Sequence, residues 1–384
     1  MPRRPTAARW ARLMLPAVPL VLSACGGGGT SAPAVAPANE VAPPALTPFA
    51  DALPAAGNGG ACLVPAQAQP VDTSQPTTVV GTGTPASCTS AAVLAAVAQG
   101  GKVTFNCGAA PVTITLADTA KVFNNRPDLV LDGGGLITLS GGGVRRVLYQ
   151  NTCDANQVWT TSRCDLQTSP TLTLQGITLA DGNSTGQAYG VGAEGGGLLF
   201  VRGGQVRLIN SRFFGGRTET TGPDLGGGAV RLLGTQSALV VGSTFGGRSD
   251  LGNLSSNGGA ISTLGASLGI YNTEISHNQA VGNGANPARA GTPGGGSGGA
   301  LYQDGNTYAL DLCGVTVHDN SAPEGGSAVI HVSNDRSSTV TVRDSVFRNH
   351  PIHPVTGFET AGLPGWFILS STGQPVITGS TISR

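Results

Sequence analysis

Several residues of the sequence have the types that acid–base chemistry requires. His277, Asp319 and Asn349 each stand two residues after an apolar eight-residue segment, and His318 and His350 lie beside them. A carboxylate next to an imidazole can orient the ring and hold a proton, which is the minimum for general acid–base work. The alternative interpretation is a hydrogen-bonded polar ladder at a turn, since Asn and Asp often occupy such positions.

A second group combines an arginine with acids. Arg231, Tyr302 and Asp304 follow a glycine-rich stretch, and Glu194 precedes one. An arginine close to acids has the chemistry of a base or a charge stabiliser, but such an arginine more often forms a solvated surface pair. Three aspartates, Asp224, Asp250 and Asp304, offer oxygen ligands for calcium, although they are far apart in the sequence.

The elements that must position these residues belong to a repeat. The eight-residue segment occurs seven times, and its copies begin 34, 32, 30, 42, 30 and 35 residues apart. Its first, third and eighth positions are apolar in nearly every copy, which indicates a strand with one buried face. The fifth position holds only Gly, Asn or Asp, which adopt left-handed backbone conformations cheaply: Gly176, Asn210, Gly242, Asn272, Gly314, Asp344 and Gly379. Each copy therefore predicts a strand, a corner and a second short strand.

Glycine-rich anchors separate the copies, and each predicts a third strand. Examples are GGGLLF at 195–200 and GGGAVR at 226–231. One such unit has too little apolar surface to fold alone, so successive units must stack, with parallel strands about 4.8 Å apart. The fold class that we predict is all-β, a right-handed parallel β-helix solenoid.

The paired phrases carry a resemblance. The glycine-rich anchors and the segments Ile275-Ser-His-Asn278 and Val317-His-Asp-Asn320 resemble degenerate forms of the repeats in chlamydial polymorphic membrane proteins. The whole pattern, over about 103–384, is similar to right-handed parallel β-helices of the pectate-lyase-like superfamily. This resemblance implies an architecture but no activity, because the fold hosts lyases, hydrolases and adhesins. The catalytic phrases of polygalacturonase-like hydrolases and of pectate lyases are absent from the sequence.

The amino-terminal region predicts export. Arginines followed by a short apolar stretch end in Leu22-Ser23-Ala24-Cys25, which resembles a bacterial lipobox, so residues 1–24 are expected to be a lipoprotein signal peptide and Cys25 the lipidated residue. An ordinary signal peptide with a chance cysteine is the alternative. Gly26 after the cysteine points by analogy to the outer membrane, on its periplasmic side or at the cell surface.

The next segments predict a tether and a cap. Residues 25–60 are mostly Gly, Ala, Pro and Ser, which predicts a disordered tether. Residues 61–102 are expected to form an N-terminal cap, in which an amphipathic helix over 89–101 covers the open end of the stack. The β-helix itself is expected over 103–384, with a corner at Gly133 and an apolar eighth position at Leu136 in its early coil.

Cysteines fit an oxidising compartment. Besides Cys25 there are six, for which fifteen pairings exist. We expect Cys88 to pair with Cys107 and Cys153 with Cys164, whereas Cys62 and Cys313 are not assigned. No CxxC or CxxH spacing supports a metal site, and none is predicted.

In a solenoid, binding and catalytic residues are expected mainly in the long loops between the coils. Residues 137–171 include Trp159, residues 214–228 include Arg217 and Asp224, and residues 279–297 enlarge one repeat. We therefore expect Trp159, Tyr302, Asp304, Arg217 and Asp224 to contact a ligand.

Two functions follow from these observations. The first is an outer-membrane-anchored surface lipoprotein, a monomer that binds a polysaccharide or a cell-surface partner through one face of the β-helix. The second is a polysaccharide lyase or glycoside hydrolase that acts in a groove between the long loops, with His277, Asp319 and Arg231 as catalytic residues. No cofactor is expected, apart from calcium for a lyase. The formal net charge is +0 and gives no reason to expect nucleic acid as a partner.

Overall fold

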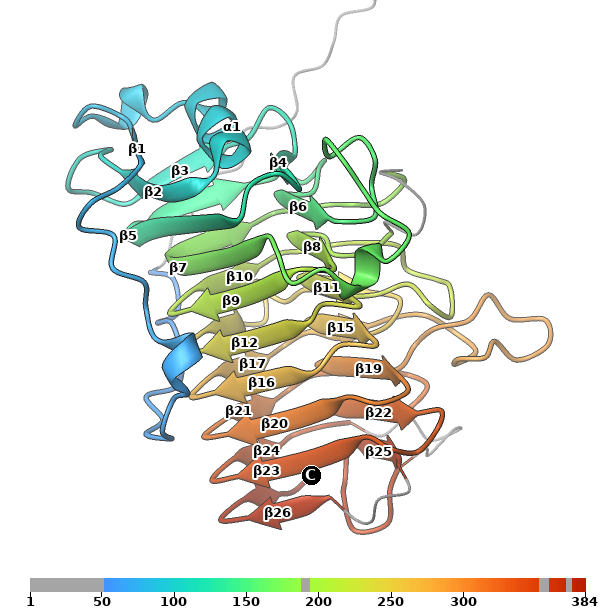
Figure 1. Ribbon diagram of the computed structural model, residues 1–384. Helices are drawn as coiled ribbons and strands as arrows, with labels where there is room; N and C mark the ends of the chain where they lie inside the picture. Colours follow the sequence, from blue (N-terminus) through green and yellow to red (C-terminus); the bar gives the residue numbers. More distant parts are fainter. Residues whose placement is uncertain (1–51, 188–193, 352–358, 371–374) are drawn as a thin grey trace, which may run out of the picture. The chain divides into compact units, whose positions relative to one another are not determined.

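The computed structural model describes residues 52–187, 194–351, 359–370 and 375–384. Apart from one short helix and three 3-10 turns, its regular elements are strands stacked as successive coils, and all pairings between named strands are parallel (Figure 1). The described part is therefore an all-β solenoid, as predicted. Helix α1 spans Ser90–Gln99, and the turns are η1 (Ala66–Ala68), η2 (Pro85–Ser87) and η3 (Cys164–Leu166).

The largest sheet, sheet A, has two faces that meet at a corner. Face A1 comprises the strands before the corner, and face A2 the strands after it. Two long strands, β5 (Asp128–Ser140) and β7 (Thr171–Ala180), continue through the corner and join both faces into one 17-stranded sheet. The remaining strands of face A1 are β1 (Thr78–Val80), β2 (Gly101–Phe105), β9 (Gln205–Ile209), β12 (Ser237–Val241), β16 (Leu268–Tyr271), β20 (Ala309–Cys313), β23 (Thr339–Arg343) and β26 (Val376–Thr378). Those of face A2 are β3 (Val112–Thr115), β10 (Arg212–Phe214), β13 (Thr244–Gly246), β17 (Glu274–Ser276), β21 (Thr316–His318), β24 (Val346–Arg348) and β27 (Thr381–Ile382).

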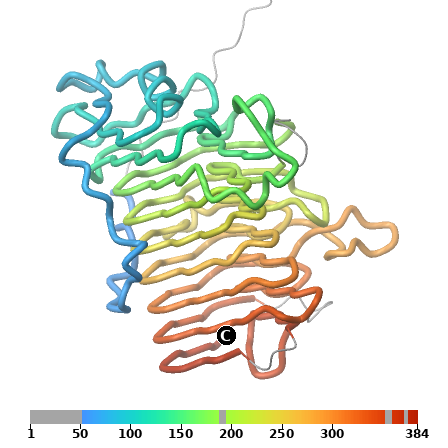
Figure 2. The backbone as a smooth tube through the Cα atoms, viewed as in Figure 1, coloured from blue at the N-terminus to red at the C-terminus, as the bar shows by residue number. Residues whose placement is uncertain are grey.

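The second large sheet, sheet B, contains the strands that the glycine-rich anchors predict. Its eight strands are β4 (Ala120–Val122), β6 (Leu148–Asn151), β8 (Leu199–Arg202), β11 (Val230–Leu233), β15 (Ile261–Leu264), β19 (Leu301–Gly305), β22 (Val329–Ser333) and β25 (Trp366–Leu369). A two-stranded sheet, β14 (Leu254–Ser255) and β18 (Gln279–Ala280), lies in the connections from face A2 to sheet B. Figure 2 shows the chain winding through these coils from its blue end to its red end.

The repeat positions of the sequence explain the core and the corners. The third position of the repeat is buried in most coils, for example at Leu174, Ile270 and Val342. All seven residues at the fifth position have φ between 48° and 63°, which confirms the predicted corner. The early coil differs: β5 turns at Gly134 and Gly135, and its register shifts before Ile137, so the corner predicted at Gly133 is wrong.

An N-terminal strap, residues 54–77, lies against the corner between faces A1 and A2. The side chains of Asn272 and Gln175 each exchange two hydrogen bonds with its backbone, at Cys62 and at Val71, with lengths of 2.8 to 2.9 Å. A disulfide between Cys62 and Cys313 holds the strap there. Figure 1 shows this segment in blue along the edge of face A1. The last residues of the predicted tether, 54–60, and the first of the predicted cap, 61–77, therefore belong to this strap. The rest of the predicted tether, 25–51, lies outside the described residues.

Helix α1 begins after Thr89, whose side chain accepts a hydrogen bond from the Ala92 backbone N–H at 3.2 Å. Its buried residues are Val93, Ala96 and Val97, and it ends at Gly100. The helix thus exists where the sequence predicts it; its role as a cap stays a prediction.

Candidate functional site

The structure separates the predicted catalytic residues into two regions. Arg231 lies on β11 of sheet B, whereas His277 and Asp319 follow β17 and β21 of face A2. His277 and Asp319 do come together, and Arg231 does lie near Tyr302 and Asp304, but the structure does not bring the three predicted catalytic residues into one site.

The outward face of sheet B carries one continuous column of side chains. The strand register places Arg231 between Phe200 and Ser262, and Tyr302 after Ser262. In full, the column runs Lys121, Tyr149, Phe200, Arg231, Ser262, Tyr302, Ile330 and Phe367. The Arg146 guanidinium lies over the Tyr149 and Phe200 rings at one end of the column. Two cavities lie along the column between Arg231 and Phe367, and we call them together the sheet B groove.

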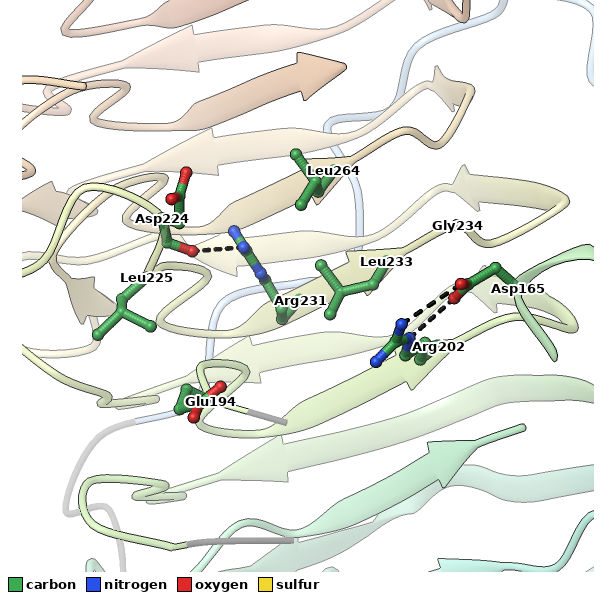
Figure 3. Close-up of a pocket in the computed structure, with 9 residues that line it drawn as sticks. All are labelled: Asp165, Glu194, Arg202, Asp224, Leu225, Arg231, Leu233, Gly234 and Leu264. Carbon is green, nitrogen blue, oxygen red and sulfur yellow. Dashed lines mark hydrogen bonds and ion pairs between the residues drawn. The ribbon is translucent and has the colours of Figure 1, made fainter. Parts of the chain in front are cut away.

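The first cavity of the groove, with a volume of about 550 Å³, lies around Arg231 (Figure 3). Its charged residues come from three sources: sheet B, the loop after β6, and the connections from face A2. They are Arg202, Arg231, Asp165, Glu194 and Asp224. Three leucines and a glycine complete the lining, Leu225, Leu233, Leu264 and Gly234.

Arg231 is the buried cation of this cavity, with a residue exposure of 4%. One terminal nitrogen donates to the Ser262 hydroxyl and the other to the backbone oxygen of Asp224. Its Nε has no hydrogen-bond partner among the described residues, and no described carboxylate oxygen lies within 4.0 Å of the guanidinium. A buried charge without an ionic partner is costly, so this guanidinium favours an anion.

Burial lowers the pKa of Arg231, and Tyr302, Asp224, Asp304 and Glu194 oppose that shift from a greater distance. An arginine stays protonated even so, because its ordinary pKa is above 12. The neighbouring Arg202 is different, since it already forms an ion pair with Asp165 at 2.8 Å. Within the cavity, Arg231 is therefore the cation that can accept a ligand carboxylate.

An amide connects the Arg231 cavity to the next part of the groove. The Asn286 side-chain nitrogen lies 3.0 Å from Asp224 Oδ1, 2.8 Å from the Tyr302 hydroxyl oxygen and 3.4 Å from Asp304 Oδ2. The Tyr302 hydroxyl in turn donates to Asp304 Oδ2 at 3.3 Å. Burial raises the pKa of Tyr302, so its phenol is neutral and serves as a hydrogen-bonding group. Three of the predicted ligand-binding residues, Asp224, Tyr302 and Asp304, thus share one network.

Beyond this network lies a second cavity of about 300 Å³. It combines apolar walls with polar groups, an arrangement that suits a sugar ring, whose face is apolar and whose edge carries hydroxyls. Its apolar lining includes Ile330, Val332, Phe367 and Leu369, and its polar lining includes Asn286, Tyr302, Asp304, Glu324 and Asn334. Arg289 and Glu324 form an ion pair that holds the loop with Asn286 against the connection between β21 and β22.

Two predicted ligand-binding residues lie apart from these cavities. Trp159 is 38% exposed, and neither cavity includes it in its lining. Arg217 is exposed and bridges neighbouring coils through its backbone. Sequence reasoning missed Arg202, Asn286 and Phe367. For Arg202 the available signal was the glycine-rich anchor at 195–200 that precedes it, whereas no such anchor precedes Phe367.

The second region, the His277 cluster, consists of Glu274, His277, His318 and Asp319. His318 Nδ1 lies 2.6 Å from Asp319 Oδ2, and its Nε2 lies 3.3 Å from Glu274 Oε1. The His277 ring meets the His318 ring edge-on at 5.7 Å between centroids. The hydrogen bond to Glu274 raises the pKa of His318 most, burial opposes it, and Asp319 adds to the rise.

A polar ladder of other residues lies next to the cluster, and two of its members, Asn278 and Asn320, directly follow His277 and Asp319. Asn253 donates to Asn278 Oδ1 at 2.8 Å, and Asn278 donates to Asn320 Oδ1 at 2.9 Å. These three side chains are completely buried. Ladder and cluster are thus adjacent columns, the ladder inside the stack and the cluster at its surface.

All six cysteines of the described part form disulfides. Cys88 pairs with Cys107 and Cys153 with Cys164, the two pairs expected from the sequence, and Cys62 pairs with Cys313. The predicted lipidation residue, Cys25, lies outside the described residues. Among those residues, no helix combines the length and the apolar character that crossing a bilayer requires.

Comparison with known proteins gave no match to a family model, to a curated protein or to a solved structure. The geometry of the two regions therefore carries the functional argument.

Proposed function

We propose that this chain is a surface lipoprotein, anchored in the outer membrane through Cys25, whose sheet B groove binds a polysaccharide that carries carboxylates. The observation that carries the proposal is the buried Arg231 guanidinium without a carboxylate partner, at the floor of a cavity of about 550 Å³. A uronate carboxylate in this cavity would pair with the guanidinium and supply the negative charge that its surroundings lack.

The adjoining cavity extends the site along the sheet. Strands β11 and β19 are separated only by β15, so the two cavities lie about 10 Å apart in strand spacing. Two strand spacings correspond roughly to two sugar units of an extended chain. The apolar wall at Phe367 and the Asn286 network would then hold a second ring.

The anchor suits this use of sheet B. The strap occupies the corner between faces A1 and A2, and Arg248 Nη1 reaches the backbone oxygen of Ala52 at 3.5 Å, at the start of the described chain. Sheet B has no part in that corner, so the strap itself leaves the groove open. We also propose that the solenoid is right-handed, belongs to the pectate-lyase-like architecture and is capped by α1.

The enzyme alternative has less support. Its three residues, His277, Asp319 and Arg231, lie on two different sheets. A lyase built around Arg231 would need Tyr302 or Asp304 as its partner.

One experiment separates binding from catalysis. The full chain is run in native gels that contain a uronate polysaccharide or a neutral one, and the same mixtures are followed for unsaturated products and reducing ends, with and without calcium. Retardation by the uronate polysaccharide without product supports the proposal. Depolymerisation supports the alternative, and an absence of both contradicts both functions.

A further inference from the structure

The His277 cluster has the composition of a metal site rather than of a saccharide site. Its residues come from two adjacent coils, because β17 pairs with β21 in a register that aligns Ser276 with His318. His277 and Asp319 directly follow this pair. Neither residue lines the cavities of sheet B, so the cluster is separate from the site proposed above.

Three potential ligand atoms lie close together in the cluster. One nitrogen each of His277 and His318 and one carboxylate oxygen of Asp319 all lie within 4.8 Å of one another. Around a tetrahedral ion with bonds of about 2.0 Å, ligand atoms are roughly 3.3 Å apart. Small side-chain rotations close that difference, since all three residues are partly exposed.

Glu274 occupies the position of an outer partner. It approaches His318 Nε2, on the opposite side of the ring from Asp319, and also accepts a hydrogen bond from the Ser276 hydroxyl at 3.0 Å. Metal-binding histidines commonly donate their second ring N–H to such a carboxylate, which fixes the tautomer. Once Nδ1 of His318 loses its proton, this arrangement leaves the Nδ1 lone pair available to an ion placed between His318 and Asp319.

The surrounding charges favour a cation. Asp250 lies close enough to His277 to interact electrostatically, and Arg348 does so with His318. Arg248 is already paired with Asp250 at 2.6 Å. The carboxylates near the two histidines, Glu274, Asp319 and Asp250, therefore outnumber the arginines there.

The backbone supports a role for these side chains. His277 and Asp319 have φ of 60° and 53°. Glycines hold the equivalent positions of the two coils before His277, Gly215 and Gly247, whereas Asp181 and Asn349 share the left-handed conformation elsewhere in the column. A side chain is harder to accommodate there than glycine. The other described histidines, His331 and His350, are buried and hydrogen-bonded inside the stack.

We propose that His277, His318 and Asp319 bind a divalent transition-metal ion of the zinc type, with Glu274 as the outer partner of His318. Two imidazoles and one carboxylate suit zinc and its neighbours, whereas calcium prefers oxygen ligands only. On binding, the ion takes the place of the proton on His318 Nδ1, which leaves to solvent. Three protein ligands leave at least one coordination position open for water or another donor.

The test is titration calorimetry of the full chain, without a histidine tag, with zinc chloride in buffers of different ionisation enthalpy. We expect one zinc ion per chain and release of a proton. Residues 277 and 319 both have a left-handed backbone conformation, which glycine and asparagine adopt easily. The variants His277→Gly and Asp319→Asn should therefore fold. Each should lose at least about 100-fold in zinc affinity, and Glu274→Gln about 10- to 100-fold.

Two control variants sharpen the test. His331→Gln replaces a buried histidine of sheet B, and His353→Ala removes a histidine outside the described residues; both should keep the affinity of the unaltered chain. Zinc binding that survives His277→Gly, or that disappears in His353→Ala, would overturn the assignment. An absence of saturable binding at 100-fold excess over the chain, or equal binding of calcium, would overturn it as well.

Discussion

The sheet B groove and the His277 cluster both gather charged side chains, but they compensate those charges differently. In the groove, the buried Arg231 has no carboxylate within ion-pair distance and faces a cavity of about 550 Å³. In the cluster, His318 has a carboxylate at each ring nitrogen. The groove therefore favours a negatively charged ligand, whereas the cluster can exchange a proton for a metal cation. One solenoid thus offers two sites for ligands of opposite charge.

Removal of the disulfide in the strap tests whether the groove and the cluster depend on the same stack of coils. Replacing Cys62 and Cys313 by alanine removes a link between residues 251 positions apart, and the chain-entropy estimate is a loss of about 5 kcal/mol in unfolding free energy. The same change at Cys153 and Cys164, 11 positions apart, should cost about 3 kcal/mol. Denaturant unfolding of both double variants measures the difference.

Both affinities should survive in whatever fraction of the strap variant stays folded. A selective loss of either glycan or zinc binding would show that the strap shapes that region directly. A smaller loss of stability than in the Cys153 and Cys164 variant would contradict the role assigned to the strap.

Low pH should reduce the free energy of unfolding of the stack beneath the groove. His331 lies on β22, completely buried, and burial lowers its pKa to about 4. The unfolded chain binds a proton near pH 6.5 and the folded chain does not, so this contribution to stability is complete above pH 6.5 and is lost as the pH falls toward 4. Its full size is on the order of 3 kcal/mol.

The matching variant is His331→Gln, which can keep hydrogen bonds to Gln303 and Ser338. Chemical unfolding at pH 7.5 and pH 4.5 should show a smaller loss of stability in the variant than in the unaltered chain. His350, whose pKa burial also lowers, accounts for part of the remaining loss. An equal loss in both proteins would contradict the buried, neutral state of His331.

Arg231→Met removes the charge of the groove and keeps most of the side-chain volume. We expect acidic-glycan affinity to fall about 10- to 100-fold, because a charge-assisted pair is lost, while stability changes little or increases. Zinc affinity should stay the same. The matched control is Arg343→Gln on face A1, where Arg343 pairs with Asp311 at 2.9 Å, and this variant should keep both affinities.

The smallest effect is expected at Trp159. This side chain lies in the disulfide-closed loop and outside both cavity linings, so Trp159→Ala should change glycan affinity less than about threefold. Affinity electrophoresis resolves such a change. A tenfold loss would mean that the bound glycan extends beyond the cavities toward this loop.

Local patterns in the sequence predicted the repeat, and its corners followed because only Gly, Asn and Asp occupy them. They also predicted that His277 and Asp319 would be neighbours, since both stand at the same distance after an eight-residue segment. The corner of the early coil was missed because β5 contains extra residues around Gly134 and Gly135.

Other features depend on contacts between distant parts of the chain. The 251-residue separation of Cys62 and Cys313 has no signature in the sequence, so the strap was mistaken for tether and cap. Asn286 reaches the groove from a long loop, whose path the repeat does not specify. The separation of Arg231 from His277 depends on which strand of each coil carries them, and that became clear only from the three-dimensional stack.

The most direct test of the central claim compares one polysaccharide with and without its charge. A uronate polysaccharide and its carboxyl-reduced derivative are placed in parallel native gels, with the unaltered chain, Arg231→Met and Arg343→Gln. We expect the uronate gel to retard the unaltered chain and Arg343→Gln, and the reduced gel to retard all three proteins equally weakly. Equal retardation of the unaltered chain and Arg231→Met in the uronate gel would contradict the account.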